Sequence, residues 1–159
     1  MTAAPRVTPG EKGPHLDQFL TFRLSRVQAK LNVQAARLLS EKAGLTLSQW
    51  RIIALIGSQE TGLASELTRR SAMDKGLFSR KLKSLTEAGL VESRPHEADH
   101  RAQVLSLTAA GRRKYEETLP HMQARQAGLQ AELTETERAV FFAVLDKLDL
   151  AAERTDFGT

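Results

Sequence analysis

Residues 74–108 combine a helical pattern with a hairpin pattern directly after it, and this pairing limits the fold more than any other stretch of the chain. On a helical wheel of about 100° per residue, a mostly apolar stripe gathers on one side: Phe78, Lys81, Leu82 and Leu85. The opposite side is small, hydroxylated or charged: Gly76, Ser79, Arg80, Lys83, Ser84 and Glu87. The pattern predicts a helix with one face for a core. Its other face suits DNA, because Arg, Lys and Ser match guanine edges and phosphates in a major groove.

Both ends of this predicted helix carry recognisable signals. Asp74 is a suitable N-cap, and Gly89 follows the last turn, where glycine commonly ends a helix. The small Gly76 in the first turn would let the backbone approach a phosphate closely. Amphipathic helices with two or three outward basic residues are common, so the DNA interpretation depends on the flanking segments.

The segment after Gly89 predicts a β-hairpin with a long tip. Residues 91–94 and 103–107 are strand candidates, and residues 95–102 join them. That connection is too long for a tight hairpin, and it carries His96, Asp99, His100 and Arg101. A long polar hairpin tip directly after a helix-turn-helix is a wing.

Upstream, residues 46–57 predict a short helix that opens with a capping box, Thr46 as N-cap and Gln49 three residues later. A brief helix follows from Leu63, and a tight turn leads from it to the helix after Asp74. Two short helices joined in this way, the second basic on its outer face, make a helix-turn-helix. Arg69 and Arg70 on the brief helix either contact phosphate or belong to a solvated face.

The remaining segments predict long helices. Apolar residues recur at steps of three and four from residue 16 to 39, which indicates one helix of about 25 residues ended by Ala43-Gly44. Thr108 caps a later helix that Pro120 should kink or split, and Thr134 with Glu137 forms a second capping box for the last helix. We expect a mainly α fold with a small β-wing (α+β), with a lead-in at 1–13, a winged lobe at 46–107, helical parts at 15–44 and 108–150, and a frayed tail at 151–159.

Charge is unevenly distributed along the chain. Residues 69–101 contain eight Lys/Arg against five Asp/Glu, whereas residues 134–159 contain three Lys/Arg against six Asp/Glu. A basic centre with an acidic end suits a protein that touches a polyanion in one place only.

Several classes of protein are disfavoured by the sequence. The chain has no cysteine, which excludes disulfides, Cys-ligated zinc and thiol redox sensing. No apolar run spans a bilayer and no secretory signal opens the chain, so we expect a cytoplasmic protein without membrane contact. Nucleotide-binding, hydrolase and metalloprotease motifs are absent, and His96 and His100 have only Glu97 and Asp99 beside them. We therefore expect no enzyme, no metal and no cofactor.

The order of elements and two motifs resemble the MarR family of bacterial transcriptional regulators. The wing motif is Asp99-His100-Arg101 followed by Leu107-Thr108-Ala109-Ala110-Gly111, and the helix before it contains Phe78-Ser79-Arg80 and exits through Gly89-Leu90-Val91. The resemblance covers roughly residues 15–150. It implies a homodimer joined by the N-terminal helix and the last two helices, a pseudo-palindromic DNA site, and most often repression that a small ligand relieves.

The resemblance also implies roles for individual residues. It assigns Ser79, Arg80 and Lys83 to the major groove, Arg101 to the minor groove, and Asp99 to an ion pair that holds Arg101. Leu77 either touches a thymine methyl or is buried in the lobe, and His100 stands where many members have a second Arg. The full set expected at DNA is Lys75, Gly76, Leu77, Ser79, Arg80, Lys83, Arg94, His100 and Arg101.

The resemblance further implies a ligand site between the lobe and the dimerisation helices, and aromatic and cationic residues of this chain are placed to line it. Such residues suit an aromatic carboxylate or its thioester. The candidates for effector binding are Phe22, Arg23, Arg26, Trp50, Arg51 and Tyr115. The alternative function is a winged helix that binds protein without specific DNA binding, and the basic wing argues against it.

Overall fold

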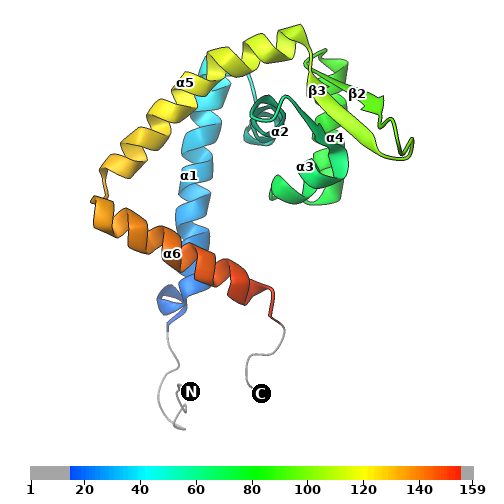
Figure 1. Cartoon of the computed structure of the whole chain (residues 1–159). Helices are drawn as coiled ribbons and strands as arrows, with labels where there is room; N and C mark the ends of the chain where they lie inside the picture. Colours follow the sequence, from blue (N-terminus) through cyan, green and yellow to red (C-terminus); the bar gives the residue numbers. More distant parts are fainter. Residues whose placement is uncertain (1–14, 155–159) are drawn as a thin grey trace.

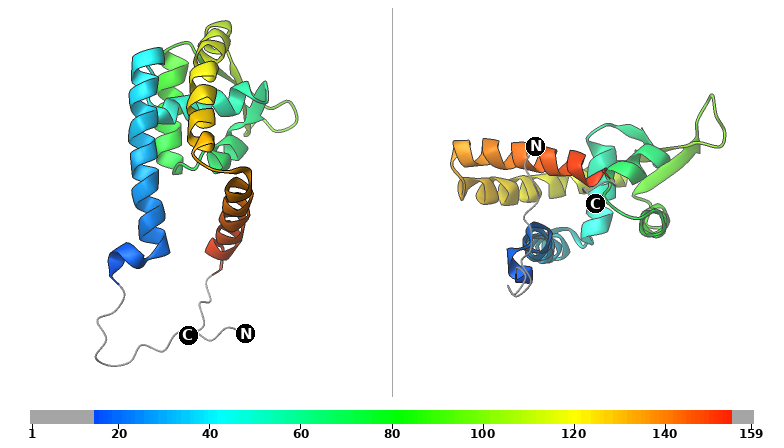
Figure 2. Two further views of the ribbon diagram at one scale, coloured as in Figure 1. Left: turned by 90° about the vertical axis from the view of Figure 1, so that its left-hand side faces the viewer. Right: turned by 90° about the horizontal axis from the view of Figure 1, so that it is seen from below.

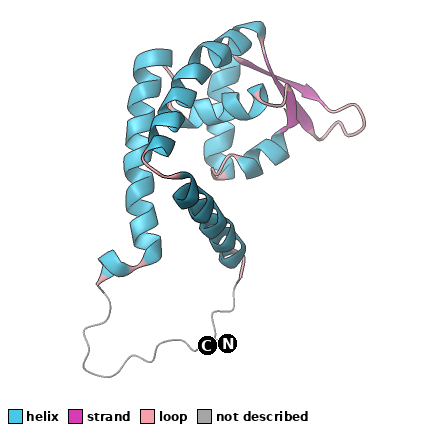
Figure 3. Ribbon diagram, turned by 60° about the vertical axis from the view of Figure 1, so that its left-hand side comes forward, coloured by secondary structure: helices cyan, strands magenta, loops and turns pink. Residues whose placement is uncertain are grey.

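Three long helices form an open frame with a lobe at one end (Figure 1). The computed structural model describes residues 15–154, so the predicted lead-in and the last five residues lie outside the described part. The frame consists of α1 (Leu20–Ala43), α5 (Ala109–Ala131) and α6 (Glu135–Ala152). The lobe lies beside the C-terminal end of α1 and the N-terminal end of α5, and all strands belong to it (Figure 3). The predicted mainly α fold with a small sheet is confirmed.

The first helix starts later than its apolar pattern predicts. Leu16–Gln18 form a 3₁₀ turn, and Phe19 takes an extended conformation (φ −71°, ψ 125°) before α1 begins. Apolar steps of three and four continue through this break, so the pattern alone could not locate it. The predicted end is correct, because Gly44 adopts the left-handed conformation (φ 64°) that ends α1.

The lobe begins with three helices, of which capping residues predict the first and the third, while the second starts one residue after the predicted Leu63. These are α2 (Leu47–Gly57), α3 (Ala64–Arg70) and α4 (Lys75–Glu87). The Thr46 backbone N–H donates to Gln49 Oε1 at 2.9 Å, and the Gln49 N–H donates to Thr46 Oγ1 at 3.3 Å. Asp74 caps α4 by accepting the Leu77 N–H at 2.8 Å. The predicted capping box and N-cap are both confirmed.

A three-stranded antiparallel sheet completes the lobe, in the order β1-β3-β2. The predicted hairpin is β2 (Val91–Pro95) and β3 (Gln103–Leu107), while β1 (Thr61–Leu63) was not predicted. β1 pairs with β3, with Gly62 opposite Leu105. A strand of three residues is too short to show alternation, and its partner lies more than forty residues along the chain.

The two C-terminal helices differ from expectation in detail. Helix α5 runs through Pro120 without a split, and its ribbon bends along its length (Figure 1). Helix α6 opens with the predicted capping box of Thr134 and Glu137. It continues to Ala152, so the first two residues of the predicted tail are helical.

The buried core lies almost entirely within the lobe. Every buried apolar side chain of the described residues falls between Ala35 and Leu105, and the centre is formed by Leu39, Ile52, Ile53, Ile56, Leu67, Leu85, Val91 and Leu105. Helix α6 has no buried residue. In the described part of the chain, no helix has the length and hydropathy needed to cross a bilayer.

Candidate nucleic-acid interface

Helix α4 presents a polar, cationic face to solvent and an apolar face to the core. Phe78 and Leu85 are buried, with 3% and 0% exposure, whereas Arg80 and Lys83 on the other side are exposed. Leu77 is half-buried, so the structure does not choose between the two predicted alternatives, contact with a thymine methyl and burial in the lobe. Lys75, Gly76 and Ser79 are exposed as well. The amphipathic division predicted for this helix is confirmed except at Ser84, which was placed on the outer face but is half-buried and bonded to α2.

One residue that holds α4 in place was not identified as such from the sequence. The Gln49 side chain completes the capping box of α2 with its oxygen and donates from Nε2 to Ser84 Oγ at 3.2 Å. Ser84 lies on α4, thirty-five residues away. Local spacing identifies Gln49 as a capping residue, but nothing local identifies its second partner. The amide therefore ties the start of α2 to α4.

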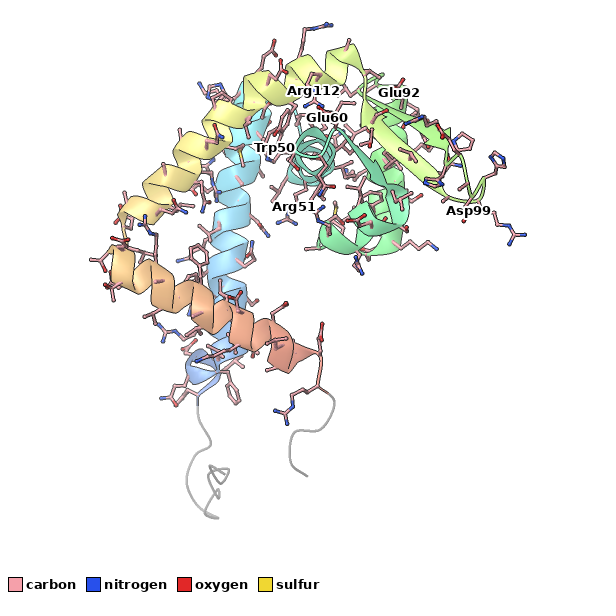
Figure 4. The ribbon with its side chains drawn as sticks, in the orientation of Figure 1. Trp50, Arg51, Glu60, Glu92, Asp99 and Arg112 are labelled. Atoms are coloured by element: carbon pink, nitrogen blue, oxygen red, sulfur yellow. The ribbon has the colours of Figure 1, made fainter. Side chains whose placement is uncertain are left out.

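The wing extends away from the rest of the lobe, and Asp99 lies at its tip (Figure 4). The tip is held by backbone bonds: the His96 N–H donates to the Ala102 carbonyl at 2.9 Å, and the Ala102 N–H donates to the Asp99 carbonyl at 2.9 Å. The candidate DNA-contacting residues of the wing, Arg94, His100 and Arg101, are all exposed.

The expected ion pair between Asp99 and Arg101 is not formed. The described residues contain three ion pairs, and this is not one of them. Asp99 Oδ1 instead accepts the backbone N–H of Arg101 at 3.0 Å, which makes an Asx turn. An exposed ion pair contributes little in water, whereas the turn bond shapes the loop. Asp99 therefore supports the wing tip through the backbone and leaves the Arg101 guanidinium available.

The Leu-Thr-x-x-Gly motif joins the wing to α5. The Thr108 hydroxyl donates to the Gly89 carbonyl at 2.6 Å and accepts the Gly111 N–H at 3.0 Å. A Cβ on Gly111 would collide with the carbonyl oxygen of Leu90. Thr108 and Gly111 thus lock the exit of α4 against the first turn of α5, which is a structural role.

An aromatic stack connects α5 to the lobe on its other side. Tyr115 stacks on Trp50, with ring centroids 5.9 Å apart, and the Arg112 guanidinium lies 5.5 Å from the Tyr115 ring centroid. Arg112 Nη1 also donates to the Gly57 carbonyl at 2.9 Å. Arg112 and Trp50 lie between α5 and α2 in Figure 4. This contact makes the orientation of the lobe depend on α5.

The six candidate effector residues fall into two groups within the chain. Phe22, Arg23 and Arg26 lie near the start of α1, where Arg26 is 5.8 Å from the Phe22 ring centroid.

The second group, Trp50, Arg51 and Tyr115, lies at the lobe. Trp50 is buried, and half-buried Arg51 donates to Asn32 Oδ1 at 3.4 Å. Trp50 and Arg51 border an open cleft of about 390 Å³ that Arg70 and Ala72 also line. Tyr115 is not among its lining residues. Among residues 15–154, no cluster of three His, Asp or Glu side chains could hold a metal ion.

Comparison with known proteins agrees with this geometry. Residues 43–102 match the MarR family model. The chain is 27% identical over 113 residues to the HTH-type transcriptional regulator BilQ of Clostridium symbiosum (strain WAL-14163), which covers 71% of this chain and 78% of that protein.

Solved structures extend the similarity to most of the chain. A MarR/EmrR family transcriptional regulator from Acinetobacter sp. ADP1 superposes with a TM-score of 0.81 at 26% identity, over 88% of this chain and 99% of that one. A mutant MarR from E. coli complexed with operator DNA superposes with a TM-score of 0.68 at 25% identity, over 86% and 99%. The chain is therefore similar to MarR-family transcriptional regulators, in its winged lobe by the family model and over most of its length by fold.

Proposed function

We propose that the protein is a homodimeric, cytoplasmic repressor that binds a pseudo-palindromic operator and is released from it by a small ligand. The observation that carries the DNA part is the exposed cationic face of α4 beside a wing with exposed Arg94, His100 and Arg101. In helix-turn-helix proteins the second helix enters the major groove. Arg80 and Lys83 then supply base and phosphate contacts, and Arg101 reaches the minor groove.

The dimer is supported by apolar surface that this chain leaves uncovered. Phe141, Phe142 and Val144 of α6 and Phe19 and Leu20 near the start of α1 are all more than 40% exposed. An open, mostly apolar cleft of about 650 Å³ lies between α1 and α6. Large apolar side chains that gather on one exposed face commonly mark a protein–protein contact. A second copy that covers the same elements gives a two-fold axis, and two lobes then read two half-sites.

The ligand part is supported by the cleft beside α2. It combines two cationic side chains, Arg51 and Arg70, with the mostly buried Trp50. Guanidinium groups bind carboxylates through paired hydrogen bonds, and an aromatic side chain in the wall suits an aromatic ligand. The cleft lies between α2 and the turn before α4, so a ligand bound there would change the position of α4. An aromatic or otherwise anionic small molecule is the class that fits.

The test is binding of the full-length protein to duplexes selected from a random-sequence pool. Fluorescence anisotropy on the selected duplex, on a scrambled duplex and across a salt series would measure specificity. We expect the selected duplex to be a near-palindrome that binds one dimer, at least about a thousandfold more tightly than the scrambled control. Equal, salt-sensitive binding to both duplexes would contradict sequence-specific regulation. No binding at low salt would favour the protein-binding winged helix.

A further inference from the structure

The side chain of Arg80 folds back over the first turn of α4. A Cβ added to Gly76 would lie 3.3 Å from Arg80 Nη1, although Arg80 is four residues further along the helix. Helical side chains lean toward the N-terminus, and residues four apart share one face. The guanidinium therefore lies at the N-terminal end of α4, the end that helix-turn-helix proteins direct at base edges.

The space above Gly76 is bounded by one anchored group and one movable group. Asp74 Oδ1 lies 3.2 Å from the same Cβ position and is held by the Leu77 N–H at 2.8 Å. The Asp74 carboxylate is thus committed to capping α4. Arg80 forms no ion pair within the described residues, so its guanidinium can shift. A methyl group at position 76 would lie slightly too close to both groups, and the guanidinium, which is the freer of the two, would shift by a few tenths of an ångström.

We propose that Gly76 is a positioning residue for sequence readout that acts through Arg80. Its missing side chain leaves the space in which the Arg80 guanidinium lies at the leading end of the recognition helix. This inference rests on the proposed operator binding by α4. It differs from a role in phosphate approach, in which the Gly76 backbone would contact DNA whatever residue stands at position 80.

A double-mutant cycle separates the two roles. Gly76→Ala, Arg80→Ala and the combined variant are measured in the full-length protein on the selected and the scrambled duplex. Alanine favours a helix interior more than glycine does, so loss of α4 cannot explain a weaker complex. We expect Gly76→Ala to weaken operator binding about tenfold and to change scrambled binding less than about twofold. In the Arg80→Ala background the Gly76 change should have no further effect. Gly76→Val should give a larger loss than Gly76→Ala.

Gly128 provides the matched control, because it is an exposed glycine within α5 and nothing lies within 4 Å of an added Cβ. Gly128→Ala should leave operator binding unchanged. Equal losses from Gly76→Ala in both backgrounds would overturn the inference and favour phosphate approach, as would no loss at all. If Arg80→Ala binds the operator normally, the major-groove role of Arg80 is refuted, and the inference about Gly76 is refuted as well. If Arg80→Ala weakens binding while the Gly76 effect persists, only the inference fails.

Discussion

The winged lobe and the α1–α6 end of the frame differ in how completely each buries its apolar residues. In the lobe, Ile52, Ile53, Ile56 and Leu105 have no exposed surface. At the other end, α6 buries nothing, and Phe141, Phe142 and Val144 are exposed. The left view of Figure 2 shows α6 and the first turns of α1 as separate rods, away from the lobe. One region satisfies its hydrophobic surface within the chain, and the other requires a further surface.

Because of this difference, substitutions in the two regions should have different effects. The lobe depends on contacts within the chain, so substitutions there change folding or DNA contact in each copy. If a second copy covers the α1–α6 end, as proposed, substitutions there change assembly. Helix α5 links the two through the Trp50–Tyr115 stack and the Arg112 bond to Gly57.

The largest expected effect comes from placing a charge in the uncovered apolar face of α6. Phe141→Asp should convert the dimer to a monomer, because burying Phe contributes roughly 1.5–3 kcal/mol and each dimer loses two such contacts. The dimer dissociation constant should rise by at least about 100-fold. Light scattering coupled to size-exclusion chromatography measures this change.

The control for this change is Ala139→Glu, which adds a charge about 160° around the same helix from Phe141. It should leave the dimer intact. Near-ultraviolet circular dichroism of Trp50, the single tryptophan, should be unchanged in both variants, since the lobe core does not involve α6. A Phe141→Asp protein that remains fully dimeric would show that another surface covers α6.

The joint between the two regions should be the next most sensitive point. Gly111→Ala forces a methyl group against the Leu90 carbonyl, where backbone cannot move aside cheaply. We expect the free energy of unfolding to fall by about 1–3 kcal/mol or more. Urea denaturation measures it, with Gly128→Ala as the matched change. The Gly128 variant should be slightly stabilised. Equal stability of the two variants would mean that α5 can shift away from Leu90.

An exposed residue of the wing should affect DNA binding alone. Arg101→Ala should weaken operator binding by about 1–3 kcal/mol, because it removes a cation from the wing tip without altering the Asx turn. Unfolding and dimerisation should not change, since Arg101 is exposed and only its backbone N–H bonds to Asp99. Unchanged operator affinity would refute the minor-groove assignment.

The sequence predicted those features whose signals are local. The amphipathic division of α4, its Asp74 cap and both capping boxes follow from spacings of three or four residues, and all are confirmed. The hairpin strands of the wing also follow from adjacent segments. Each of these elements is largely specified by residues within one or two turns of it.

The features that the sequence did not predict depend on distant partners or on a choice between similar bonds. Strand β1 exists through its pairing with β3, and the Gln49–Ser84 bond joins two helices. Asp99 could bind the Arg101 side chain or its backbone, and the spacing is the same for both. The space above Gly76 is defined by where a long arginine side chain lies, which no residue pattern records.

The smallest expected effect concerns pH and the start of α6. The Thr134 backbone N–H and hydroxyl both donate to Glu137, each at 2.8 Å, and these bonds lower the pKa of Glu137 below its ordinary value of 4.5. Because the folded pKa is the lower one, the stabilisation is complete above the unfolded pKa and is lost as the pH falls through the folded pKa. Glu137→Gln can keep a capping side chain without a titrating group, so it should remove this part of the acid sensitivity. An NMR titration of the Glu137 carboxyl carbon measures the pKa directly. A Thr134→Ala protein loses the hydroxyl but keeps the backbone N–H, so the pKa should move only part of the way up toward 4.5, and an unmoved pKa would show that the hydroxyl bond does not contribute to the shift. Since these bonds join only the N-cap and the first turn of α6, the same titration in the Phe141→Asp protein tests whether that helix keeps its local order without the proposed partner copy.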